Sequence, residues 1–288
     1  MFVCIALGYN KIMFIGTFWF IFGVVIGSFL NVLVIRLGTG ESVVSGGSRC
    51  LSCKRRLHWP ELIPLVSFFI FRGHCGHCGS RISWQYPAVE FATGLVFLFI
   101  WLRIQQNFQF SIFNFQTIIS FLFVAAMASL LIAISIYDIR HQIIPNQLAY
   151  PFIVLALFSV VWRLKNWSAF GGGKLAGENL AVGIGLFAFF ALLWFVSRGR
   201  WMGFGDAKLA LGIGWWLGWP LGITAFLFSF WTGAVVGVFL LIFSVPRRLK
   251  GKYSLASRLP FGPFLAAGAL AAFFVGERAV DWYFRLFF

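Results

Sequence analysis

Four cysteines in two closely spaced pairs are the strongest chemical pattern in this 288-residue chain. Residues 54–74 separate the first pair, Cys50 and Cys53, from the second, Cys75 and Cys78. Two CxxC pairs at such a spacing are typical of a tetrahedral zinc site, because each pair chelates the metal from one tight turn. Since four protein ligands leave no open coordination position, we expect these cysteines to hold a structural Zn²⁺.

Two other readings of the cysteine segment stay open. The pairs could form two disulfides, although disulfides rarely persist in the reducing cytoplasm, where the charge distribution described below places this segment. A histidine, either His58, His74 or His77, could also replace one thiolate, but four suitably spaced cysteines make that arrangement less favourable.

A second pattern lies in the acidic residues, of which the chain has only 8. Asp138 ends one apolar run, and Asp206 closes the tetrapeptide Gly203-Phe204-Gly205-Asp206 just before another. A carboxylate at a membrane segment costs a few kcal/mol, so its presence points to function. When two carboxylates lie close, one keeps its proton and hydrogen-bonds a peptide carbonyl, while the ionised one activates water. Asp138 and Asp206 are therefore predicted to form an aspartic-protease pair.

The aspartates also allow structural and transport interpretations. Asp206 could simply cap its helix, and Asp138 could pair with Arg140 or Lys208. Acidic residues within membrane segments also serve as proton relays in transporters, but those are expected near the bilayer midplane. Because both aspartates lie at one face, their positions favour hydrolysis at the membrane boundary.

The overall composition requires a membrane protein. The chain is 60% hydrophobic, 20% aromatic and only 11% charged, with a formal net charge of +15. Soluble domains carry roughly 25% charged residues, and disordered chains are far less hydrophobic, so both classes are excluded. A nucleic-acid partner would explain the positive charge but not the hydrophobicity. We expect membrane lipid around the chain and no nucleic acid.

The apolar runs predict an all-α polytopic membrane protein with about eight transmembrane helices and a small cytoplasmic zinc-binding loop. Each run approaches the ~20 residues that a helix needs to cross the hydrocarbon core. The run 209–246 is too long for one helix and is expected to turn at Trp219-Pro220. The predicted spans are residues 12–35, 86–102, 117–137, 143–162, 179–197, two helices within 209–246, and 259–276.

The basic residues predict the orientation of these spans. Of the 23 Lys and Arg residues, 16 fall at residue 36 or in the alternate loops 37–85, 138–142, 198–208 and 246–258. Lys and Arg favour the cytoplasmic side, so both termini are expected outside and the cysteine loop and both aspartates on the cytoplasmic side. Three regions follow: a first helix in 1–36, the zinc module in 37–85 and a peptidase bundle in 86–288.

In its ordered motifs the chain resembles the bacterial type IV prepilin peptidases, membrane aspartic proteases of the GxGD group. The similar stretches surround both cysteine pairs and both aspartates along nearly the whole chain. They are Gly27-Ser28-Phe29-Leu30-Asn31-Val32, Leu57-His58-Trp59-Pro60-Glu61-Leu62-Ile63-Pro64, Tyr86-Pro87-Ala88-Val89-Glu90-Phe91-Ala92-Thr93-Gly94, Asp138 with Pro145-Asn146, Gly203–Asp206 and Pro260-Phe261-Gly262-Pro263. Two positions depart from the family pattern: Leu51 stands where proline is common, and Phe204 is the middle residue of GxGD.

The resemblance implies an enzyme of the bacterial inner membrane that cleaves the basic leader of prepilins or pseudopilins. It implies catalysis by Asp138 and Asp206, zinc ligation by the four cysteines, and methylation of the new N-terminus with S-adenosylmethionine. Candidate residues for the methyltransferase site are Asn31, Glu61, Gly73 and Glu90, each of which could equally be a helix cap or a loop turn. The chain has no GxGxxG nucleotide fingerprint, so a peptidase without methyltransferase activity is the alternative.

Overall fold

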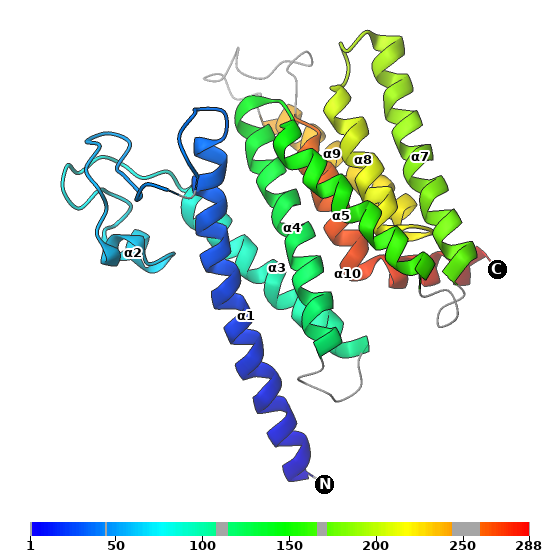
Figure 1. The fold of residues 1–288 in the computed structure, drawn as a ribbon, viewed down its shortest axis with the longest axis horizontal. Helices are drawn as coiled ribbons and strands as arrows, with labels where there is room; N and C mark the ends of the chain where they lie inside the picture. The colour runs from blue at the N-terminus through cyan, green and yellow to red at the C-terminus, as the bar shows by residue number, and fades with distance from the viewer. Residues whose placement is uncertain (1, 44, 108–114, 166–171, 244–259, 288) are drawn as a thin grey trace. The chain divides into compact units, whose positions relative to one another are not determined.

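In the computed structural model the described residues are mostly helical, except for the long loop module between Arg36 and Gln85. The structure describes residues 2–43, 45–107, 115–165, 172–243 and 260–287, which fall into two compact units divided between Ser129 and Leu130. Figure 1 shows both units, which we describe separately. The loop 246–258, which contributed to the predicted orientation, lies outside the described residues.

The first unit is built on two long helices and a loop module. Helix α1 (Phe2–Arg36) packs along α3 (Gln85–Asn107), and the module between them contains only η1 (Trp59–Leu62) and α2 (Val66–Ile70). In Figure 1 the module lies where α1 ends and α3 begins. An aromatic cluster joins this pair to α4 (Phe115–His141), with the rings of Trp19 and Phe121 4.0 Å apart. Aromatic pairs of this kind are each worth about 0.5–1.5 kcal/mol beyond the area they bury.

The described residues of the second unit form the end of α4 and five further helices. They are α5 (Asn146–Lys165), α7 (Gly172–Ser197), α8 (Phe204–Leu217), α9 (Leu221–Phe243) and α10 (Gly262–Phe287). Helix α8 packs between α5 and α7, as Figure 1 shows, because glycines bring the backbones together. A Cβ atom on Gly214 would lie 2.5 Å from the Cα of Gly183 in α7, and one on Gly212 would lie 2.7 Å from the Phe152 ring in α5.

Seven of the described helices are long and apolar enough to cross a membrane. The predicted sixth span is the exception: α8 has 14 residues, or about 21 Å at ~1.5 Å per residue. The predicted turn at Trp219-Pro220 is present, and α9 runs antiparallel to α10 after it. Leu221 at the start of α9 meets Gly276 late in α10, and Gly233 further along α9 meets Phe264 near the start of α10. The all-helical class is confirmed, with seven full-length span candidates and one short helix in place of eight equal spans.

Several helices extend more than a turn beyond the predicted spans. Helix α1 begins at Phe2 instead of residue 12, and α7 begins at Gly172 instead of residue 179. Helix α10 continues to Phe287 instead of ending near residue 276. Its last turns carry Arg278, Asp281 and Arg285, the charged residues before which the predicted span was ended. The candidate span of this helix nevertheless runs to Leu286, and charged residues at its end are compatible with a helix that leaves the hydrocarbon.

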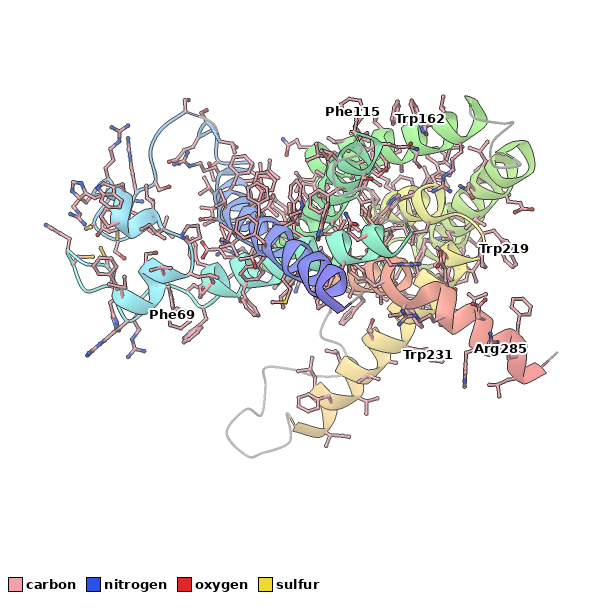
Figure 2. The ribbon with its side chains drawn as sticks, turned by 90° about the horizontal axis from the view of Figure 1, so that it is seen from below. Phe69, Phe115, Trp162, Trp219, Trp231 and Arg285 are labelled. Atoms are coloured by element: carbon pink, nitrogen blue, oxygen red, sulfur yellow. The ribbon has the colours of Figure 1, made fainter. Side chains whose placement is uncertain are left out.

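Apolar side chains cover the outside of the second unit. Figure 2 shows Trp162, Trp219 and Trp231 projecting outward, and all three are exposed, as expected of lipid-facing or interfacial rings.

Close contact between α1 and α3 depends on glycines at three positions. A Cβ atom on Gly27 would lie 2.8 Å from the Cα of Glu90, and one on Gly23 would lie 2.8 Å from the carbonyl oxygen of Thr93. Gly94 in α3 meets Val24 and Phe20 in the same way. Small residues at such spacings let membrane helices approach until their backbones touch.

Replacing Gly27 by alanine should therefore separate α1 from α3. The contact is with backbone, which cannot rotate away, so we expect a loss of about 1–3 kcal/mol in unfolding free energy. Gly237→Ala in α9 is the matched control, because its Cβ would meet nothing within 4 Å and alanine is the better helix former. Thermal unfolding of the purified proteins in detergent measures both. Equal midpoints for wild type and Gly27→Ala would contradict the packing argument.

Candidate active site and metal centre

Asp138 and Asp206 lie in one buried site of the second unit. Asp138 is in the last turn of α4 and Asp206 in the first turn of α8, and their exposed fractions are only 4% and 7%. The negative charge of Asp138 acts on Asp206 strongly enough to shift its titration, so the two carboxylates are electrostatic neighbours. The structure thus brings together the two aspartates that the sequence singled out, although 67 residues lie between them.

Backbone N–H groups hold both carboxylates. Gly203 donates to Oδ2 of Asp206 at 3.2 Å, and Gly262, at the start of α10, donates to Oδ2 of Asp138 at 3.0 Å. A Cβ atom on Gly262 would lie 2.6 Å from that same oxygen, so only glycine leaves room for the contact. Gly262 was part of a recognised motif, but no role had been predicted for it. Its partner lies 124 residues away in sequence, a separation at which no local signal could identify the contact.

The electrostatics of the pair favour a shared proton. Burial raises the pKa of Asp206 to about 7, with the nearby charge of Asp138 acting in the same direction and the Gly203 N–H acting against both. Two carboxylates that interact in this way titrate as a unit, so the pair shares one proton up to about pH 7. One ionised and one protonated carboxyl group is the state that aspartic-protease chemistry requires.

The structure also bears on the alternative readings of the aspartates. The Asp206 carboxylate accepts a hydrogen bond from the Gly203 amide and so caps the start of α8, while it is also a buried acid. The capping role and a catalytic role are therefore compatible. Among the described residues, Lys208 contacts other groups than Asp138. Its Nζ donates to Oδ1 of Asn146 at 2.9 Å and lies over the Tyr150 ring.

In the first unit the four cysteines form a compact cluster. The Sγ atoms of Cys50, Cys53, Cys75 and Cys78 all lie within 4.8 Å of one another, and none is in a disulfide. A tetrahedral site with Zn–S bonds of about 2.3 Å separates its sulfurs by about 3.8 Å. The 3.9 Å between the Sγ atoms of Cys50 and Cys78 matches that spacing. The donor set therefore fits a metal ion, and no histidine is needed to complete it.

The two cysteine pairs sit on equivalent tight turns. In the first turn, the amide of Lys54 donates to the carbonyl of Cys50 at 2.9 Å, and in the second, the amide of Gly79 donates to Cys75 at 3.0 Å. Lys54 and Gly79 both have positive φ, 59° and 68°, which glycine adopts without strain and lysine only at a cost. Backbone bridges, Arg49 with Arg56 and His74 with Arg81, close the two turns.

The crowding of the thiols changes their acidity. Hydrogen bonds from the Cys53 backbone and the Ser80 hydroxyl lower the pKa of Cys50 to about 6, and Ser80 also lowers the pKa of Cys78. A hydrogen bond with the Arg55 backbone lowers the pKa of Cys53. Burial and the neighbouring thiols of Cys50 and Cys78 together outweigh this bond and raise the pKa of Cys53 to about 11. The cluster therefore disfavours four thiolates unless a cation offsets their charge.

Two of the four residues proposed for methyl transfer lie where α1 and α3 meet. The Asn31 side chain donates to the carbonyls of Gly27 and Tyr86, both at 3.3 Å. The Glu90 carboxylate accepts from the amide of Leu65 at 2.7 Å, which fixes the module to α3. Leu65 has φ +60°, a strained conformation for a leucine. Both side chains are buried and hydrogen-bonded, so their contacts are those of anchors for the module.

The other two, Glu61 and Gly73, lie within the module in different settings. Oε1 of Glu61 pairs with Arg55 at 2.6 Å, and its Oε2 accepts from the amide of His58 at 2.8 Å. Gly73 instead lines a pocket of about 500 Å³ together with seven other residues: Phe68, Phe69, Arg72, His74, Arg81, Ile82 and Trp84. Apart from Gly73, and from His74 as a possible metal ligand, the sequence had assigned no site role to these residues.

Comparison with known proteins agrees with these features. Residues 21–104 match the bacterial peptidase A24 N-terminal domain, and residues 125–238 match the type IV leader peptidase family. A prepilin leader peptidase/N-methyltransferase from Bacillus subtilis (strain 168) is 32% identical over 93% of this chain and 97% of its own length. One from Stutzerimonas stutzeri is 29% identical over 92% of each chain.

No solved structure matches the chain significantly. The matched regions cover both the cysteine module and the aspartate pair, and the relatives are similar over almost their full lengths. This multi-pass membrane protein belongs to the type IV leader peptidase family.

Proposed function

We propose that this chain removes the leader from type IV prepilins or pseudopilins and then methylates the new N-terminus. The function rests on family membership and on relatives that carry the name prepilin leader peptidase/N-methyltransferase. The observation that supports the peptidase most directly is the buried pair of Asp138 and Asp206 at converging helix ends. The four-cysteine module and its adjoining pocket support a separate region for methyl transfer.

In the proposed cleavage, Asp138 is the base and Asp206 the acid. The ionised Asp138, held by the Gly262 amide, takes a proton from water while the water oxygen bonds to the carbonyl carbon of the scissile peptide. Asp206 gives its proton to the carbonyl oxygen. The tetrahedral intermediate then collapses: the C–N bond breaks as the leaving amine takes the proton from Asp138. One hydroxyl of the intermediate returns its proton to Asp206 as the carboxylic acid product forms. The reaction needs no covalent intermediate.

The substrate is proposed to approach from the cytoplasm. Lys and Arg concentrate on the side that carries the cysteine module and the aspartates, which the positive-inside rule assigns to the cytoplasm, with both termini outside. A basic leader would remain in water there, while the apolar helix of the prepilin stays in the bilayer beside the enzyme. The exposed apolar faces of the second unit, including Trp162 and Trp231, are compatible with a lipid-embedded partner.

The division of labour is proposed to follow the predicted regions. The module in 37–85 holds a structural Zn²⁺ and, with the flanking helices, carries out methyl transfer. The bundle in 86–288 carries out cleavage. S-adenosylmethionine, when bound, would supply an electrophilic methyl group, and this chain's own residues would hold it beside the newly exposed amine. Asn31 and Glu90 contribute by anchoring the module to α1 and α3.

Asp138→Asn and Asp206→Asn should each lower prepilin cleavage by at least about 100-fold, since each removes one acid–base partner. Leader removal from a purified prepilin measures the effect. Asp281→Asn is the matched control, because that carboxylate is exposed near the end of α10. Both catalytic variants should still methylate a precleaved pilin. Cleavage near the wild-type rate by either variant would reject the assigned pair.

Cleavage should also fall as the pH rises above about 7. With the pKa of Asp206 raised to about 7, higher pH removes the shared proton and leaves two carboxylates without an acid, so kcat/KM should decline about tenfold per pH unit. Methylation provides an internal comparison, because an amino terminus with a pKa near 8 becomes more nucleophilic over the same range. A cleavage rate that kept rising through this range would contradict a shared proton.

Metal content tests the cysteine cluster. Wild-type protein should contain one zinc per chain, measured by mass spectrometry of the purified protein, and replacement of all four module cysteines by serine should abolish it because serine is a poor zinc ligand. The fifth cysteine, Cys4, lies outside the module, so Cys4→Ser is the control that should retain the metal. Stoichiometric zinc in the quadruple variant would show that the ion binds elsewhere.

A further inference from the structure

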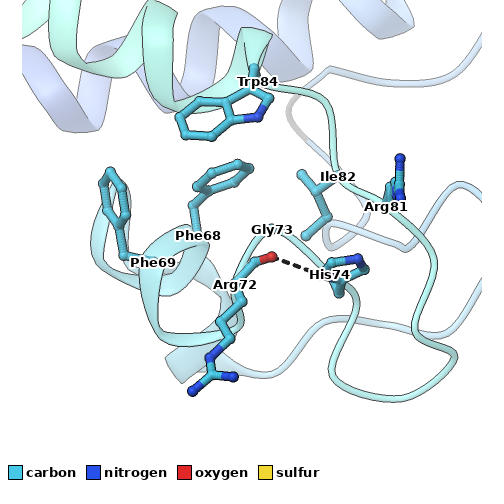
Figure 3. Close-up of a pocket in the computed structure, with 8 residues that line it drawn as sticks. All are labelled: Phe68, Phe69, Arg72, Gly73, His74, Arg81, Ile82 and Trp84. Atoms are coloured by element: carbon cyan, nitrogen blue, oxygen red, sulfur yellow. Dashed lines mark hydrogen bonds between the residues drawn. The ribbon is translucent and has the colours of Figure 1, made fainter.

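We propose that the pocket between α2 and the second cysteine turn is the S-adenosylmethionine site, a proposal that rests on the proposed methyltransferase function. Figure 3 shows Phe68, Phe69 and Trp84 on one side of this pocket, with Ile82 and His74 facing them. At about 500 Å³, it falls within the range of about 300–1,000 Å³ that is usual for small-molecule sites.

The aromatic side of the pocket suits a flat, positively charged ligand. The rings of Phe68 and Trp84 lie 4.8 Å apart at 61°, and those of Phe68 and Phe69 lie 5.8 Å apart at 87°. Phe68 is buried, whereas Trp84 and Phe69 keep 69% and 63% of their surfaces exposed. They can therefore accept an adenine ring by stacking and a sulfonium cation through their π faces.

Charge at the margin of the pocket suits the remaining part of the ligand. Arg72 and Arg81 line the pocket, and no acidic residue does. Guanidinium groups bind carboxylates through paired hydrogen bonds, so the amino-acid end of S-adenosylmethionine would be recognised there. The lining residues include no carboxylate, so the pocket is unsuited to Ca²⁺ or Mg²⁺. The combination of aromatic faces and arginines thus matches all three parts of the ligand: base, sulfonium and carboxylate.

The floor of the pocket is built by backbone geometry. Gly73 has φ +69°, and a Cβ atom there would lie 3.1 Å from the Phe68 ring. Its amide donates to the Phe68 carbonyl at 2.8 Å, and its carbonyl accepts from Ile82 at 2.8 Å. A side chain at this position would crowd Phe68, which lines the cavity. The pocket therefore accounts for Gly73, the one methyltransferase candidate that lines it.

The pocket also adjoins the metal centre. His74 and Arg81 face each other across the bridge that closes the second cysteine turn, and both line the cavity. Nδ1 of His74 lies 2.7 Å from the Arg72 carbonyl oxygen, which ties the turn to the end of α2. A metal that fixes the cysteine turns would thereby fix one wall of the pocket.

Equilibrium dialysis of the full-length protein in detergent with labelled S-adenosylmethionine tests the site. Trp84→Ala should weaken binding at least tenfold, and Trp84→Phe should restore most of it. Trp59→Ala is the matched control, because this tryptophan is also exposed in the module but does not line the pocket. Zinc content and prepilin cleavage should stay at wild-type values in all three variants, which shows that the module and the bundle are folded.

The arginines are tested with a ligand that lacks the group they bind. The double variant Arg72→Ala/Arg81→Ala should lose at least tenfold in affinity for S-adenosylmethionine, yet bind decarboxylated S-adenosylmethionine as wild type does. Ultraviolet crosslinking of the labelled ligand to the wild-type protein should modify the peptides that contain Phe68 and Phe69 or Trp84. Wild-type affinity in Trp84→Ala, equal losses for both ligands in the double variant, or crosslinks confined to other peptides would each overturn the site.

The outcomes separate this proposal from the function on which it rests. Wild-type enzyme that cleaves prepilin but never transfers the methyl group would reject the methyltransferase function, and the pocket assignment with it. Wild-type enzyme that methylates while Trp84→Ala binds the donor normally would reject only the pocket. If Trp84→Ala binds the donor normally but loses association with anionic lipid vesicles, the rings contact the membrane surface and the assignment fails.

Discussion

A carboxylate taken out of water must find hydrogen-bond donors inside the protein, because an unsatisfied buried charge costs more than most contacts can offset. Asp138 and Asp206 find theirs in the backbone amides of Gly262 and Gly203. Both donors are glycines, and a side chain on Gly262 would collide with the carboxylate it serves. This single requirement makes the end of α4 and the starts of α8 and α10 meet at one place.

The helices of the second unit follow from that convergence. Since α8 and α10 both begin at the aspartates, the chain leaves the site along α8, turns at Trp219-Pro220 and returns along α9 beside α10. Gly183 and Gly214 allow the short helix to pack closely against α7. Membrane helices gain little from excluding water, so such backbone contacts carry much of the packing energy.

The first unit solves a different problem, which is to order a loop too small to bury a core. Below about 70–80 residues a single core rarely stabilises a fold unless a metal or disulfides are added, and the clustered thiols of Cys50, Cys53, Cys75 and Cys78 provide the ligands for a metal. Glu90 fixes the middle of the loop through the Leu65 amide. The residues that line the aromatic pocket follow Leu65 and flank the second cysteine pair, so both attachments bear on its walls.

The sequence by itself determined the features that depend on neighbours along the chain. Apolar runs placed the helices, the spacing of four cysteines predicted their cluster, and the scarcity of acids pointed to Asp138 and Asp206. The tertiary structure alone decided the role of the Gly262 amide, the short α8, and the separation of Gly73 from Glu61. Hydropathy and ligand spacing are local properties, whereas a hydrogen bond across 124 residues or a pocket wall depends on which helix ends and turns come to face each other.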